Sequence, residues 1–147
     1  MTKKELIDRI VFILEDAKTA VLATTDTSGP PCMRWMSPVL FPSRPGVLYA
    51  VTSPNLAKAR QIEKHPDVEW MLQTRSLNEV ILLHGKINMI DNPSLKAEVM
   101  QAIGNRLHIF WKIEKESADF IVLETIIDEG IYFLPMEGRK EIVSFRG

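Results

Sequence analysis

The chain has 147 residues, of which 46% are hydrophobic and 25% charged, and these proportions are typical of a soluble globular protein. We therefore expect one domain over residues 1–147. Because 18 basic residues are balanced by 19 acidic ones, the net charge of -1 predicts no general affinity for nucleic acid or for a membrane surface. Cys32 is the only cysteine, which excludes an internal disulfide and favours a cytoplasmic location. No apolar stretch approaches the ~20 residues of a membrane-spanning helix, and the N-terminus lacks the apolar core of a signal peptide.

Three helices are predicted from their N-terminal signals. The first begins with a capping box formed by Thr2 and Glu5, and apolar residues then recur at helical spacing to about residue 17. A Ser-Pro pair at residues 53–54 supplies an N-cap and a first helical residue, so a short second helix should start there and end before the next proline. An Asn-Pro pair similarly predicts a third helix over residues 93–103.

Seven strands are predicted where runs rich in β-branched residues lie between turn-forming residues. Their expected ranges are 19–25, 32–40, 47–52, 68–74, 79–89, 120–127 and 131–134. Pro38 should interrupt the second strand because proline has no N–H to donate, and Gly130 should end a tight turn between the last two strands. Most strands directly follow a hairpin partner, so we expect a mainly β fold, an antiparallel barrel of six or seven strands with peripheral α-helices.

The residue types of metal and nucleophile chemistry are scattered along the chain. His65, His84 and His108 lie far apart, without the short spacing to other ligands that metal sites show, so we expect structural or surface roles and no metal. The G-x-S-x-G, H-E-x-x-H, P-loop and G-x-G-x-x-G motifs are also missing from the sequence. The hydrolase, zinc-protease and common nucleotide-binding folds therefore have no sequence support.

A small polar and basic set on the middle strands predicts an anion site. Arg34 lies within an otherwise apolar strand, Thr52 and Ser53 end the next strand, and Lys58 lies on the helix that follows. The amide groups of a helix N-terminus could add donors beside the hydroxyl groups, and phosphate is the expected guest. The alternative is that Arg34 and Lys58 are ordinary solvated surface charges. The spacing of these residues in the sequence does not favour either interpretation.

Two ordered segments carry a more specific resemblance. Residues 19–36 include TAVLATTD and GPPCMRWM, and residues 48–68 include LYAVTSP and KARQIEKHPDV. Together they resemble the pyridoxamine 5'-phosphate oxidase-like split-barrel flavoproteins, most closely the general stress protein class. The resemblance covers residues 5–90 well and the remainder loosely. It implies an FMN-binding split barrel of antiparallel Greek-key type, and a homodimer with flavin mononucleotide (FMN) in clefts at the subunit interface.

The resemblance also implies a role for individual residues. Arg34 and Lys58 should bind the phosphate of FMN, to which Thr52 and Ser53 should donate hydrogen bonds. The residues expected beside the flavin are Trp35, Met36, Ser37 and Val51, with Val80 contacting the ring through its backbone. Trp111 is expected either to reach the partner's flavin or substrate pocket or to be an aromatic residue of the core or interface.

As a function, the resemblance implies an oxidoreductase that passes a hydride or electrons through flavin N5, between a nicotinamide donor and an unknown small acceptor. A non-catalytic flavin carrier or redox sensor is the alternative, as is the same barrel binding deazaflavin or haem. Oxidation of pyridoxine phosphate is not expected. Where the true oxidases carry a substrate-binding lysine this chain has Pro38 and Val39, and their Arg- and Trp-containing C-terminal tail is not evident in residues 134–147.

Overall fold

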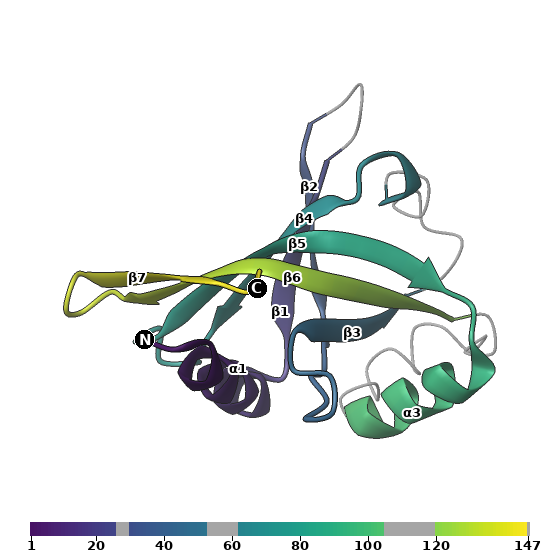
Figure 1. Ribbon diagram of the computed structural model, residues 1–147, viewed down its shortest axis with the longest axis horizontal. Coiled ribbons are helices and arrows are strands. Elements are labelled where there is room, and N and C mark those ends of the chain that lie inside the picture. Colours follow the sequence, from purple (N-terminus) through teal and green to yellow (C-terminus); the bar gives the residue numbers. More distant parts are fainter. Residues whose placement is uncertain (26–29, 53–61, 105–119, 147) are drawn as a thin grey trace.

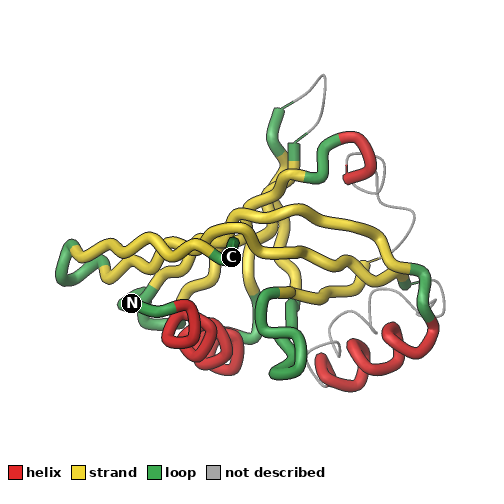
Figure 2. Tube along the Cα trace, viewed as in Figure 1, coloured by secondary structure: helices red, strands yellow, loops and turns green. Residues whose placement is uncertain are grey.

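The computed structural model describes residues 1–25, 30–52, 62–104 and 120–146. Figure 1 shows two long helices and seven strands, and in Figure 2 both helices lie below the strands. The elements are α1 (Lys3–Ala17), β1 (Ala20–Thr24), β2 (Cys32–Met36), β3 (Val47–Thr52), β4 (Asp67–Gln73), β5 (Val80–Ile90), α3 (Pro93–Ile103), β6 (Ile121–Leu134) and β7 (Arg139–Ser144). Among the described residues, no helix is both long and apolar enough to cross a membrane.

All strand pairs are antiparallel, and the strands follow the order β2-β1-β4-β5-β6-β3, with β7 paired to the far end of β6. The chain beyond β2 returns to the other edge, where Val39 and Tyr49 exchange two backbone hydrogen bonds of 2.8 and 2.9 Å. This bridge joins the two ends of the sheet into a barrel. The predicted break at Pro38 is confirmed, and between β2 and β3 the barrel wall is split.

The barrel interior is filled by the inward side chains of the strands. Trp70 on β4 is buried there, and its indole N–H donates to the Thr125 hydroxyl across the barrel at 3.0 Å. A buried tryptophan needs such an acceptor, because an unpaired N–H in an apolar interior is costly. A second apolar cluster lies between α3 and β3, where Val99 and Ile103 pack against Tyr49 and the neighbouring strand residues.

Helix α1 begins as its sequence predicts. The Thr2 hydroxyl accepts from the Glu5 amide at 3.1 Å, and the Glu5 carboxylate accepts from the Thr2 amide at 3.0 Å. Helix α3 likewise starts at Pro93 after Asn92, whose side chain caps the amide of Leu95. Of the predicted short helix after β3, residues 53–61 lie outside the described part of the chain.

The C-terminal strands correct one prediction. The tight turn expected to end at Gly130 does not exist, because β6 runs without interruption from Ile121 to Leu134. The chain instead turns after Leu134 and returns as β7, a strand that the sequence analysis did not predict. Gly130 serves close packing, since a Cβ atom at this position would collide with the Leu6 side chain of α1.

Candidate functional site

Arg34 is the most unusual polar residue of the predicted site. It lies on β2 in register with Leu22, so its side chain leaves the sheet on the inner face, and it is half-buried. Its Nη1 atom is shielded from solvent and has no hydrogen-bond partner within the described residues. Burial lowers the pKa of Arg34, an effect only partly offset by the nearby thiol of Cys32. A buried guanidinium N–H without an acceptor is costly, and an anionic guest would remove that cost.

The end of β3 carries the other described polar candidate. Thr52 is buried at the last position of this strand. If the antiparallel register of the Val39–Tyr49 bridge is continued, Met36 comes opposite Thr52. Arg34 lies two residues further along the same face of β2, just beyond the end of β3. The Arg34 and Thr52 side chains therefore both project from the inner face of the sheet.

Three other candidates, at the ends of β2 and β3, have buried side chains. Met36 packs in the barrel core, Ser37 is buried at the end of β2, and Val51 packs in the cluster beneath α3. Met36 and Val51 can therefore face a ligand only through their backbone. Strand β2 is suited to this role, because among the described strands it pairs with β1 alone and so forms an edge of the sheet.

Trp35 points to the opposite face from Arg34, because consecutive side chains of a strand alternate. It is 78% exposed and begins a row of apolar side chains that crosses the outer face of six strands. Successive cross-strand pairs define this outer row as Trp35, Val21, Met71, Leu82, Ile131 and Ile142. Sequence reasoning missed the row, although these strands carry apolar residues on both faces, which is a readable signal for a sheet covered on both sides.

Val80 lies on this outer face, in register with Gln73 and Phe133. Strands β1 and β4 separate it from β2, so one chain does not bring Val80 and Arg34 into a common pocket. Of the other predicted site residues, Ser53, Lys58 and Trp111 lie outside the described residues. The structure therefore places Arg34 and Thr52 on the inner face of the sheet, and Trp35 and Val80 on its outer face.

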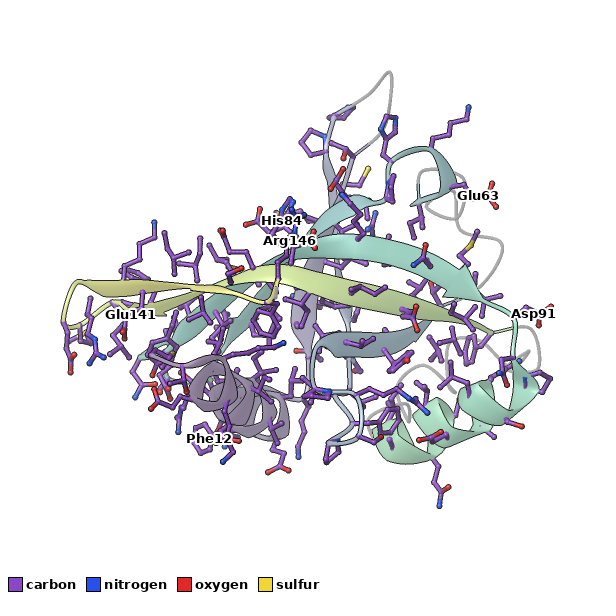
Figure 3. All side chains as sticks on the ribbon, in the orientation of Figure 1. Phe12, Glu63, His84, Asp91, Glu141 and Arg146 are labelled. Atoms are coloured by element: carbon purple, nitrogen blue, oxygen red, sulfur yellow. The ribbon has the colours of Figure 1, made fainter. Side chains whose placement is uncertain are left out.

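The two described histidines, His65 and His84, lie on different segments of the chain. His84 is on the outer face of β5, where its Nε2 atom lies 3.8 Å from Asp67, and Figure 3 shows it near Arg146. His65 precedes β4 and has a buried Nε2 atom without a partner in the described part of the chain. Among the described residues, no three His, Cys, Asp or Glu side chains form a group that could hold a metal ion.

The available groups fit the phosphate end of a nucleotide. The Arg34 guanidinium has an unused N–H and matches the planar geometry of a phosphate or carboxylate. Thr52 adds a buried hydroxyl, and the edge of β2 can present backbone donors and acceptors to a planar ring. Trp35 and Val80 offer apolar surface on the opposite face.

The fold is shared with solved structures of low sequence identity. A Clostridium acetobutylicum protein described as related to general stress protein 26 of Bacillus subtilis superposes with a TM-score of 0.75 at 14% identity, over 99% of this chain and 97% of that one. An FMN-binding protein of Nostoc punctiforme, related to pyridoxamine 5'-phosphate oxidase, gives 0.64 at 14%, over 95% and 96%. A heme-binding protein of Mycobacterium smegmatis gives 0.70 at 17%, over 94% and 57%.

A search of curated proteins gave no match. The family model for pyridoxamine 5'-phosphate oxidase matches residues 6–133, which is most of the chain and includes β2, β3 and β5. The predicted split barrel and the predicted resemblance are both confirmed. The chain belongs to the pyridoxamine 5'-phosphate oxidase family.

Proposed function

We propose that this protein is an FMN-dependent oxidoreductase that acts as a homodimer, with the flavin between the two subunits. The observation that carries the proposal is the shielded Nη1 atom of Arg34, which has no partner in the described part of the chain. An arginine that is desolvated but unpaired is prepared for an anion, and the phosphate of FMN is such an anion. The FMN-binding protein of Nostoc punctiforme, which shares the fold, supports the choice of ligand.

In this proposal the chain's own groups bind and orient. Arg34 would neutralise the phosphate, the Thr52 hydroxyl would donate to it, and Ser53 and Lys58 would complete the contacts. The backbone of residues 35–37 would run beside the isoalloxazine ring. When bound, FMN would supply hydride or one-electron chemistry at N5, between a nicotinamide donor and a small acceptor. Donors near N5 and O4 would favour the reduced ring, where negative charge accumulates.

The homodimer is supported by the outer row. Trp35 at one end is 78% exposed and Ile142 at the other is 65% exposed, and the half-buried side chains between them continue the apolar surface. A contiguous apolar patch of this kind on a soluble protein marks an interaction surface. A second copy covering it would bring its own groups toward Trp35 and Val80, which one chain leaves exposed or half-buried. The single free cysteine suits a reducing compartment, so we expect the dimer to work in the cytoplasm.

Two other functions would use the same barrel. A non-catalytic flavin carrier or sensor would need the same phosphate contacts, but it would show no turnover. A haem or deazaflavin protein would differ in its chromophore, and the heme-binding protein of Mycobacterium smegmatis shows that the fold accepts haem. The absorbance spectrum distinguishes haem or deazaflavin from FMN, and the measurement of turnover distinguishes an oxidoreductase from a carrier or sensor.

The first test is an absorbance spectrum of the purified protein, followed by acid release and chromatography of the chromophore. We expect one FMN per chain, or uptake of added FMN by colourless protein. Oxidation of NADH or NADPH by the FMN-loaded protein would then separate an oxidoreductase from a carrier. Protein that neither contains nor takes up FMN would contradict the proposal, and a released haem or deazaflavin would replace it.

The second test introduces a charged side chain into the outer row. We expect wild-type protein to elute as a dimer and Ile142→Glu to elute as a monomer with greatly weakened FMN binding, because a buried carboxylate at the interface would lack a partner. Met136→Glu is the matched control, since Met136 is 88% exposed in the turn before β7 and lies outside the row. An Ile142→Glu protein that remains a dimer with full FMN binding would place the interface elsewhere.

A further inference from the structure

A separate groove runs between α1 and the proline-rich segment that joins β2 to β3, which lie side by side in Figure 1. Its apolar walls are Ile7 and Val11 on the helix and Leu40, Pro42 and Pro45 on the segment. We call it the α1 groove. It is open to solvent along one side and has a volume of about 750 Å³, within the range of small-molecule sites.

The helix has a wider apolar face than the barrel core uses. Leu6, Ile10 and Ile13 are fully buried against the sheet, whereas Ile7 and Val11 lie one step around the helix and remain half-buried. These two residues are one helical turn apart and therefore form a stripe along the helix. Ile7 packs against the edge of the core, and together with Val11 it forms the apolar wall of the groove on the helix side.

The α1 groove is elongated. Val11 and Leu40 also line a smaller cavity of about 150 Å³, which continues along the helix to Glu15 and reaches Ala102 on α3. From Lys3 to Glu15 the helix rises by about 18 Å, at 1.5 Å per residue. Apolar side chains that lie in a row along a helix suit a linear hydrocarbon chain better than a compact or planar ligand.

The charged residues of the α1 groove itself lie towards the start of the helix, whereas Glu15 lines the smaller cavity beyond it. Lys3 and Lys4 line the groove at the start of α1, together with the single carboxylate of Asp8, so this end carries a net positive charge. The Lys3 ammonium lies 5.2 Å from the centre of the Phe145 ring, which holds it above apolar surface. Neither lysine forms an ion pair within the described residues. An anionic head group next to an apolar chain is complementary to this arrangement.

We infer that the α1 groove binds a free long-chain fatty acid, with its carboxylate at Lys3 and Lys4 and its acyl chain along Ile7, Val11 and Leu40. Each methylene group of an acyl chain that is removed from water adds to the affinity, so a long chain binds without further polar contacts. The groove shares no lining residue with the proposed flavin site. The flavin proposal and the fatty-acid proposal can therefore be tested independently of each other.

The test is fluorescence titration of the full chain with cis-parinaric acid, a fatty acid that becomes bright in apolar surroundings, followed by displacement with palmitate. We expect saturable binding of one molecule per chain. Replacing both lysines (Lys3→Ala with Lys4→Ala) should weaken palmitate binding about tenfold, which corresponds to loss of one charge-assisted contact. Binding of hexadecanol, which has the same chain without a carboxylate, should not change between the two proteins.

The control is the double variant Lys86→Ala with Lys140→Ala, which removes the same charge from the sheet and should bind palmitate like wild type. Val11→Gln should weaken palmitate and hexadecanol alike, and circular dichroism would check that each variant is folded. The proposal is overturned if folded wild-type protein shows no saturable binding, or if the double lysine variant binds palmitate as wild type does. Conversion of a dimer to a monomer by Val11→Gln would assign the groove to a second copy and also overturn it.

Discussion

Two arginines of this protein, Arg9 on α1 and Arg34 on β2, differ in whether the fold supplies a hydrogen-bond acceptor. Arg9 on α1 donates through Nε to Glu79 at 2.8 Å and through Nη2 to the other oxygen of that carboxylate at 2.5 Å. Tyr132 on β6 donates to Glu79 as well. Arg34 on β2 is half-buried too, yet its Nη1 atom has no acceptor among the described residues. Arg9 therefore has its hydrogen-bond acceptor within the fold, whereas the Nη1 atom of Arg34 has none among the described residues.

The pKa shifts follow this difference. The hydrogen bond to Glu79 raises the pKa of Arg9, whereas burial lowers the pKa of Arg34. Burial by itself would raise the pKa of Glu79, but hydrogen bonds from Arg9 and Tyr132 outweigh it, and the net direction is down. An arginine that fastens a helix to a sheet finds its carboxylate inside the fold. The desolvation cost of a buried arginine without an acceptor remains uncompensated until an anionic ligand binds.

The largest expected effect comes from breaking the satisfied cluster. Glu79→Gln should lower the free energy of unfolding by about 2–3 kcal/mol, because Arg9 loses its counter-charge and Tyr132 keeps only a weaker acceptor. The cost stays below that of a fully buried pair, since Arg9 is about a third exposed and can be hydrated. Urea denaturation measures this change. Glu137→Gln, an exposed carboxylate in the turn before β7, should shift the midpoint little, and an equal shift in both variants would contradict the role of the cluster.

Arg34 should respond in the opposite way. Arg34→Met should leave the stability of the ligand-free protein unchanged or raise it by up to about 1 kcal/mol, because a desolvated and unpaired charge is removed. The same change should weaken FMN binding about 10–100-fold, as expected for loss of a charged hydrogen bond. Denaturation and FMN titration measure the two effects. Arg146→Met, which removes an exposed arginine paired with Asp128, should not affect FMN binding. Full FMN affinity in Arg34→Met would remove Arg34 from the site.

The smallest expected effect is a loss of folding stability at alkaline pH. Burial and the hydrogen bond to Glu79 raise the pKa of Tyr132 from 10.0 to about 12, so the folded state keeps its phenol proton longer than the unfolded state does. The resulting stability is fully present below pH 10 and is lost as the pH rises towards about 12. The stability difference between wild type and Tyr132→Phe should therefore narrow across this range in denaturation at several pH values. Tyr49 is present in both proteins and cancels, and a constant difference would contradict the shift.

Much of the fold could be predicted because the signals were local. The capping box of Thr2 and Glu5, the Asn-Pro start of α3 and the proline break after β2 each act within a few residues. Gly130 was misread because a Glu-Gly pair is an ordinary turn signal. In the folded chain the missing side chain makes room for Leu6, a contact across more than a hundred residues that no local pattern contains.

The candidate site was predictable in part for the same reason. Arg34 stands out in an apolar strand, and strand alternation alone separates it from Trp35. Val80 could not be located without knowing that β1 and β4 lie between β2 and β5. Glu79 carried no signal either, because a charged residue at the start of a strand reads as solvent-exposed until Arg9 and Tyr132 are seen around it.

The sequence by itself therefore determined the helix starts and the alternation of the strands, and it singled out Arg34 as the candidate anion-binding side chain, because these features depend on neighbours in the chain. Only the tertiary structure decided which arginine is satisfied and which is not. That outcome depends on burial and on partners brought together by strand order, and both arise when distant segments pack. The outer row and the α1 groove have the same origin, since each is assembled from residues of elements that are separate in sequence.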